Sequence, residues 1–410
     1  MRDLATEYVP LVRTQGEYRI VSSIMKDADV VRMSAEFADT YEVDDSWRLW
    51  LDPGFDGYEF VFENGWYGKG DGQGWHGWIQ QFNGYDLLQS ESNASDAAQG
   101  DVDDFVARVL DSIVENDPHM ISVPQVPYGL GTARHGINRK LAKATGKWKE
   151  SNWPKGTLIL PAVLLHHDAY RTRAASSPKV NAISRALELS RATGVWIVHA
   201  DFDDLAGKGN FDRDRFPSLI GFHEQLAEAL PAKTFTCAGP YWGINLILWA
   251  RGIVDVPVIG CGGAYRYYLP KPPQVLQRAS TKIAIPPLRR WYGVNSELLR
   301  WVKTAKGKFP PRNEVREALQ QIESSLGQFL GPGGRTPAMR QSAEFYYDWL
   351  CEIREVQLRG RGLFLFQDFS KAVVNGSHIG TKLPKQSGLS SDARDPGFIA
   401  QQFMLQCLPR

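Results

Sequence analysis

The chain has 410 residues, of which 43% are hydrophobic and 23% are charged, a balance typical of a globular protein with a sizeable core. No stretch reaches the roughly 18 uninterrupted apolar residues that a membrane span requires, so we expect no membrane partner. The first residues, MRDLATEYVP, lack a basic region followed by an apolar core, which predicts a cytoplasmic protein without a secretory signal. The four cysteines lie far apart and favour reduced, mostly buried thiols over a zinc site or a disulfide framework.

The net charge of +1 conceals two charged segments of opposite sign. Residues 36–117 carry 19 Asp and Glu against 3 Lys and Arg, a net charge of −16, whereas residues 264–312 carry 11 Lys and Arg against one Glu, a net charge of +10. Six aromatic residues are interleaved with these basic groups, namely Tyr265, Tyr267, Tyr268, Trp291, Tyr292 and Trp301. Cations bind phosphates and flat rings stack on bases, so residues 264–312 are a candidate nucleic-acid surface. The alternative is that the two segments neutralise each other, within the fold or in a homo-oligomer.

Short β-rich runs alternate with helix-like stretches along most of the chain. Residues 1–45 are expected to form an N-terminal cap that includes an added strand, VVRM (30–33). The pattern predicts further strands that begin at residues 48, 120, 157, 195, 233, 257, 282 and 363. Helices are expected between them, for example at 102–116, where Phe105, Val109 and Ile113 recur at helical spacing.

Eight parallel strands separated by helices predict a (β/α)8 TIM-type barrel, with an open doubly wound sheet as the alternative. The barrel is expected to comprise residues 46–293 and 359–410. Residues 294–358 contain two or three helix-like stretches interrupted by GPGGRTP (331–337), and they predict a helical insertion before the last strand.

Polar residues follow the expected strands, and a barrel brings such residues together because its βα loops meet at the C-terminal face. The first strand ends at Asp52, the second at Gln125, the third at His166, and the fourth at His199 followed by Asp201. Asp52 and Asp201 are the acids nearest to strand ends. They predict a catalytic pair that acts at a glycosidic carbon without a cofactor, and Gln125 and His199 are expected to bind the substrate.

The stretch WIVHADFDD (196–204) supports a second interpretation. His199 and Asp201 share one face of a strand, so together with His166 they are candidate ligands for a divalent ion in a metal-dependent hydrolase. The alternative is that His199 binds no metal and is a hydrogen-bonded histidine of the core. A third alternative is a barrel without catalytic activity that binds nucleic acid or a partner protein.

Two later loops predict contacts with substrate. AGPYWGIN (238–245) presents Tyr241 and Trp242 as a stacking surface, unless both rings pack beneath a helix. GCGG (260–263) contains Gly262 and Gly263, whose small size lets backbone N–H groups approach an anion, and Arg266 follows as a positive charge. These residues complete the candidate substrate-binding set.

Two short stretches, LWLDPGFDG (49–57) and SVPQ (122–125), resemble strand ends of tRNA-guanine transglycosylase-like barrels. The resemblance implies a (β/α)8 fold and exchange at a nucleobase–ribose bond. It also implies that Asp52 contacts the exchanged base, and that Gln125 is a looser counterpart of a substrate-binding residue. The Cys/His zinc motif of that family is missing here.

Overall fold

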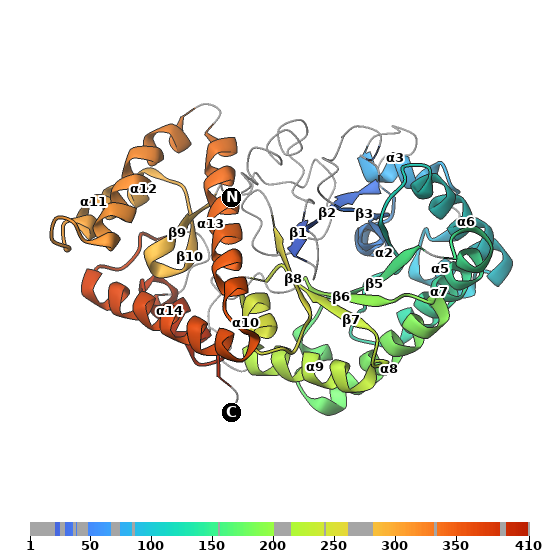
Figure 1. The fold of residues 1–410 in the computed structure, drawn as a ribbon. Helices are drawn as coiled ribbons and strands as arrows, with labels where there is room; N and C mark the ends of the chain where they lie inside the picture. Colours follow the sequence, from blue (N-terminus) through green and yellow to red (C-terminus); the bar gives the residue numbers. More distant parts are fainter. Residues whose placement is uncertain are drawn as a thin grey trace.

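A curled, mostly parallel β-sheet forms one lobe of the molecule, and helices cover its outer face (Figure 1). The structure is a computed structural model, and it describes residues 21–24, 29–35, 38, 48–66, 74–83, 87–154, 156–200, 215–241, 243–260, 282–331, 334–385 and 391–408. Within these ranges, every helix is too short or too polar to cross a membrane.

Eight strands follow one another around this sheet in the order of the sequence. They are β1 (Val21–Ile24), β2 (Asp29–Ser34), β3 (Arg48–Asp52), β4 (Met120–Ser122), β5 (Thr157–Leu164), β6 (Gly194–His199), β7 (Phe235–Ala238) and β8 (Val256–Gly260). Neighbouring strands from β2 to β8 are parallel. Strand β1 is antiparallel both to β2 and to β8, and therefore links the two ends of the parallel part.

The expected α/β class with a curled parallel sheet is confirmed, and β3 to β8 are six of the predicted strands. One predicted strand is not formed, and another is formed but lies outside this sheet. The run that begins at residue 282 is β9 (Lys282–Ile285), which pairs with β10 (Arg290–Gly293) in a separate antiparallel sheet. The run 363–366 lies inside helix α14 (Leu358–Ile379). In their place the sheet contains β2, whose residues were expected in the cap, and β1, so a regular (β/α)8 repeat is not formed.

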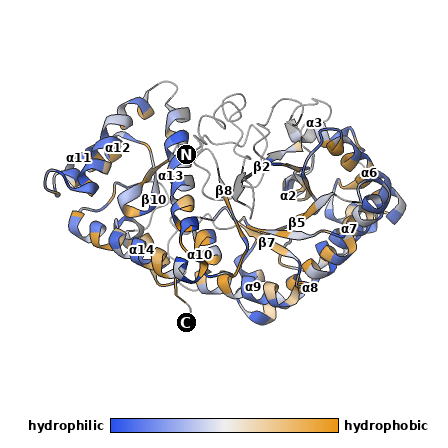
Figure 2. Ribbon diagram, viewed as in Figure 1, coloured by the Kyte–Doolittle hydropathy of each residue, from blue (hydrophilic) through white to orange (hydrophobic). Residues whose placement is uncertain are grey.

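Four long helices lie along the outside of the parallel strands: α6 (Gln99–Val114), α7 (Ala133–Asn152), α8 (Arg173–Ser190) and α9 (Arg215–Ala229) (Figure 1). Shorter elements connect them, namely η2 (Phe55–Gly57), α2 (Tyr58–Asn64), α3 (Gly74–Gln80), α5 (Glu91–Asp96), η3 (His167–Ala169) and α10 (Ile244–Ala250). Phe105, Val109 and Ile113 are buried on α6, as their spacing predicts. Apolar residues alternate with polar ones along these helices, as amphipathic helices against a sheet require (Figure 2).

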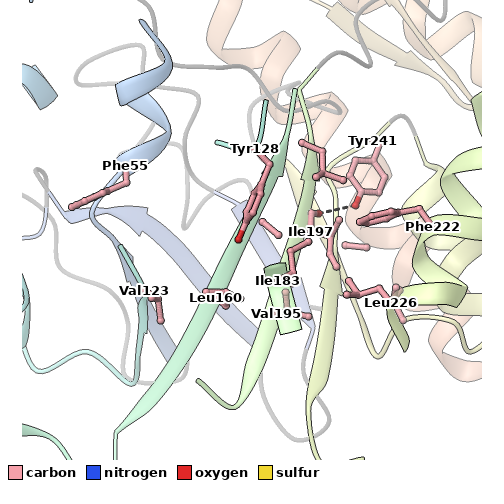
Figure 3. Close-up of a cluster of buried hydrophobic side chains, with 14 of the residues drawn as sticks. Phe55, Val123, Tyr128, Leu160, Ile183, Val195, Ile197, Phe222, Leu226 and Tyr241 are labelled. Atoms are coloured by element: carbon pink, nitrogen blue, oxygen red, sulfur yellow. Dashed lines mark hydrogen bonds between the residues drawn. The ribbon is translucent and has the colours of Figure 1, made fainter. Parts of the chain in front are cut away.

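Side chains alternate between the two faces of each strand, and each face has its own core. On β6, Val195 and Ile197 face the helical layer, where Phe222 of α9 belongs to the same cluster (Figure 3). Trp196 and Val198 point the other way, into an inner cluster whose described residues lie in the strands or directly beside them. This alternation decides which polar residues at the strand ends face inward.

The second lobe has a separate hydrophobic core around β9 and β10. Its elements are η5 (Pro286–Leu288), α11 (Ser296–Lys306), α12 (Glu314–Leu330), α13 (Arg335–Glu355) and α14, followed by η6 (Asp392–Arg394) and α15 (Phe398–Met404). Helices α13 and α14 also contribute Trp349 and Phe369 to the main core, so they join the two lobes. Cys237 and Cys407 are buried free thiols, as expected.

Candidate functional site

A pocket of about 230 Å³ opens at the carboxyl ends of β3, β4 and β5. It is lined by Glu59, Glu63, Glu91, Gly129, Leu130, Gly131, Ala133, Arg134, Leu165 and His166. The glutamates come from α2 and α5, which follow β3, whereas His166 directly follows β5. Ligands of parallel α/β sheets bind at this edge, because the connections that leave the strands converge there.

The Arg134 guanidinium is the centre of the pocket's polar network. Its Nη1 forms an ion pair with Glu59 and donates to the carbonyl oxygen of Pro127 at 3.1 Å, while its Nε donates to Glu91 at 2.8 Å. Arg134 lies in the first turn of α7, and Glu59 and Glu91 lie in the first turns of α2 and α5. A planar guanidinium holds two carboxylates in fixed directions, so three separate elements are joined at this point.

The carboxylates of the pocket have different surroundings. Glu59 is buried, and burial raises its pKa more than the hydrogen bond and charge of Arg134 lower it, with a further rise from the neighbouring Glu63. The side chain of Glu91 is 39% exposed, and Glu63 is exposed. Carboxyl groups with unequal surroundings in one pocket are the usual basis of acid and base catalysis.

Asp52 is buried at the end of β3, as the sequence predicts, but it does not line this pocket. Its carboxylate forms an ion pair with Arg32 of β2 and accepts a hydrogen bond from the backbone N–H of Gly54 at 3.1 Å. The Arg32 guanidinium lies 4.1 Å from the ring centroid of Trp196. Period-two alternation places Arg32 and Asp52 on the inner face with Trp50, so this pair belongs to the inside of the curled sheet.

His199 points away from the inside of the sheet, contrary to the interpretation that directs it into a barrel mouth. It shares its strand face with Ile197, and its ring contacts Tyr170 at 4.6 Å, Tyr241 at 5.1 Å and His223 at 5.7 Å between centroids. Burial, and then the neighbouring His223 and His167, hold the pKa of His199 well below its usual value. His199 is therefore a neutral histidine of the helical layer.

Tyr241 and Gln125 also have structural roles. The Tyr241 hydroxyl donates to the carbonyl oxygen of Ile197 at 2.7 Å, and its fully buried ring is no stacking surface (Figure 3). The Gln125 amide donates to the carbonyl oxygens of Pro124 and Asn138, at 2.9 and 3.0 Å. Neither lines the pocket, so neither of these substrate-binding predictions is supported by position.

The predicted metal set is not brought together by the described residues. His166 is exposed at the pocket, whereas His199 is enclosed in the helical layer. Within the described ranges, no group of three or more His, Cys, Asp or Glu side chains has a metal-binding arrangement. Asp201, Trp242, Gly262, Gly263 and Arg266 lie outside the described residues.

The described part of the basic segment, residues 282–312, lacks the predicted stacking surface. Trp291, Tyr292 and Trp301 are buried in hydrophobic cores. Arg289 is paired with Asp368 at 2.6 Å, whereas Arg300, Lys303, Lys308 and Arg312 are exposed. The prediction requires exposed cations together with exposed aromatic rings, and residues 282–312 expose only the cations.

Sequence reasoning missed Glu59, Glu91 and Arg134. The signal was their position, since each lies in the first turn of a helix at the edge where the parallel strands end. Glu59 and Glu63 are also four residues apart, a spacing that puts both on one face of α2. No protein-family model, no curated protein and no solved structure matches this chain.

Proposed function

We propose that this chain is an enzyme that cleaves or exchanges a glycosidic bond, with Glu59 and Glu91 as the working carboxylates. One observation carries the proposal: two carboxylates of unequal exposure are held on the guanidinium of Arg134 inside a pocket. Glycosidic chemistry needs one carboxyl group that donates a proton and another that attacks or activates water. The buried Glu59, with its raised pKa, suits the acid, and the more exposed Glu91 suits the second role.

The charge of the pocket favours an uncharged or cationic substrate. Three glutamates and one arginine line it, so the local charge is negative and disfavours a phosphate group. A cavity of about 230 Å³ is smaller than the usual pocket for a drug-sized ligand and suits a single ring. A small, non-phosphorylated glycoside fits both properties.

Two narrower versions of the proposal have less support. The nucleobase–ribose version depends on Asp52 and Gln125, and both are engaged by other groups of the protein. The metal-dependent version needs a ligand group that the described residues do not form. A mechanism that uses the carboxylates of the pocket requires neither the Asp52 and Gln125 contacts nor a metal. The pocket also lies at the carboxyl edge of the sheet, which is the functional edge in TIM-type barrels.

The test is hydrolysis of a panel of nitrophenyl glycosides and unmodified nucleosides by the purified chain and by Glu59→Gln. We expect turnover of at least one substrate. For substrates with a poor leaving group, Glu59→Gln should lose about a hundredfold or more in kcat, because an amide N–H is too weak an acid to protonate the leaving group. The matched control is Glu224→Gln on α9, whose carboxylate pairs with Arg251 outside the pocket. No turnover of any panel member, or full activity in Glu59→Gln, would contradict the proposal.

A further inference from the structure

Lys179 is a buried cation beside the pocket. It lies on α8 and is 2% exposed, and its Nζ reaches the loop that precedes α7. There it hydrogen-bonds to the carbonyl oxygens of Leu130, at 3.3 Å, and Gly131, and lies 3.1 Å from Nε2 of His135. No carboxylate of the described residues forms an ion pair with it, so carbonyl dipoles and an imidazole stabilise its charge.

The two carbonyl groups belong to the wall of the pocket. Gly129, Leu130 and Gly131 line the cavity, and Arg134 follows in the first turn of α7. Leu130 is 58% exposed, so burial contributes little to fixing it. Among the described residues, the hydrogen bonds from Lys179 therefore attach residues 129–131 to helix α8.

His135 completes this arrangement only while it is neutral. A hydrogen bond from the Lys179 ammonium to Nε2 requires the lone pair of that nitrogen. Burial, and then the charge of Lys179, lower the pKa of His135 to about 4. A proton on Nε2 would direct an N–H group against the ammonium, so this hydrogen bond is lost when His135 is charged.

We propose that Lys179 is a positioning residue that holds the pocket wall, residues 129–131, in its closed form, and that His135 releases the wall when it takes up a proton. The effect on catalysis rests on the proposed function. The attachment of the wall by Lys179 does not rest on the proposed function, since it consists of hydrogen bonds within the protein.

Other charged and titratable groups surround this pair. Arg134 is the nearest cation, and burial, followed by the Arg134 charge, lowers the pKa of Lys179 to about 8. Arg134 is itself compensated by Glu59 and Glu91, and the Tyr128 ring lies 5.8 Å from that of His135. Glu63 and His166 line the pocket. The elements packed on α7 and α8 carry further groups, among them Asp103 on α6, His167 and Asp168 on η3, and His223, Glu224 and Glu228 on α9.

The sign of the pH effect follows from these two pKa values. An open wall exposes His135 and Lys179, which then return toward their ordinary pKa values of 6.5 and 10.5. The open form therefore binds more protons, and opening is favoured as the pH falls from about 6.5 toward 4. Lys179 acts in the same direction at higher pH, because loss of its proton between 10.5 and 8 is easier in the closed form.

Hydrogen exchange of the backbone amides of residues 128–135, corrected for the intrinsic effect of pH, tests this proposal. From pH 7 to pH 5 we expect the opening of the wall to rise about twentyfold in the unmodified chain and to stay constant in His135→Gln. Lys179→Met should open the wall about tenfold already at pH 7. The matched control is Lys149→Met on α7, because Lys149 is another buried lysine, whose Nζ donates to the carbonyl oxygen of Arg191 at 3.0 Å, and it should leave the wall unchanged.

A wall whose corrected exchange is the same at pH 5 and pH 7 would overturn the proposal, as would equal effects of Lys179→Met and Lys149→Met. The outcome is independent of enzymatic activity. If no glycoside is turned over while the exchange follows the expected pattern, the proposed function fails and the role of Lys179 stands. If activity is found, Lys179→Met should raise KM more than it lowers kcat, because the wall contacts the substrate and the carboxylates remain.

Discussion

Asp52 and Arg32 are buried together on the inner face of the sheet, with side chains 6% and 5% exposed. The Trp50 and Trp196 rings lie at 5.9 and 4.1 Å from the guanidinium. The Asp52 carboxylate neutralises the buried Arg32 cation. This structural role explains an acidic residue at the strand end without assigning it a part in catalysis. Sequence reasoning located Asp52 correctly, but its partner came from β2, in a region expected to be a separate cap.

Removal of the Asp52 charge should therefore cost stability. We expect Asp52→Asn to lower the free energy of unfolding by roughly 3 kcal/mol, because Arg32 loses its carboxylate partner in a low-dielectric environment. Glu188→Gln is the control, since its pair with Arg185 is 52% and 61% exposed, and it should change stability by less than about 0.5 kcal/mol. Urea unfolding measures both. Equal, small effects, or a loss of activity at unchanged stability in Asp52→Asn, would restore the catalytic interpretation of Asp52.

His199 shows why strand-end residues alone do not define a site. Its position at the end of a buried strand was correctly predicted, but the direction of its side chain depends on which face of β6 meets the helices. That face is fixed by Val195 and Ile197, which pack in the helical layer, so His199 follows them at period two (Figure 3). The sequence contains the alternation but not the identity of the face that the helices cover.

At the scale of elements, long periodic segments were predicted well and short apolar runs were not. The run LFLF (363–366) was taken for a strand from four residues. In the structure, Leu365, Phe369, Ala372, Gly376 and Ile379 are buried at alternating spacings of four and three, the period of a helix. The longer window contains the correct signal, whereas four apolar residues are compatible with either element.

The close packing of α7 against α8 gives a prediction at this scale. A Cβ atom at Gly146 would overlap the backbone carbonyl oxygen of Leu189, so Gly146→Ala should destabilise the fold by about 2 kcal/mol. Gly136, on the same helix, has open space at its Cβ position, and Gly136→Ala should stabilise the fold by about 0.5 kcal/mol through helix propensity. Thermal unfolding of the two variants checks the pair. A neutral or stabilising Gly146→Ala would show that the two helices are not packed this closely.

At the scale of the whole molecule, the sheet combines strands that were predicted as its members with two strands that were not. The nearly continuous apolar run of β5 is recognisable because both of its faces are buried. β1 was not predicted, and β2 was predicted as the strand VVRM but assigned to the cap. Their place in the sheet depends on pairing with β8 and β3, partners that lie far along the chain or beyond an intervening segment. Pairing over such distances leaves no local signal. Cytoplasmic location, homo-oligomer formation and the proposed domain boundaries stay predictions.

The residues of the pocket could not be predicted from the sequence for a similar reason. Its glutamates lie on two helices and its arginine on a third, so their convergence follows from the packing of α2, α5 and α7 around the edge of the sheet. The acidic character of residues 36–117 was visible in the sequence, and part of it is now located at this edge. The rest of the acidic segment has no assigned role.

The most direct test of the central claim is binding of a small piperidine iminosugar, measured by isothermal titration calorimetry. Its cationic ring imitates the positive charge that develops at a glycosidic carbon, which carboxylates of this pocket would stabilise. We expect binding to the unmodified chain and to Glu224→Gln with equal affinity, and at least about tenfold weaker binding to Glu59→Gln and Glu91→Gln. Absence of binding, or equal affinity for all four proteins, would contradict the assignment of this pocket as the functional site.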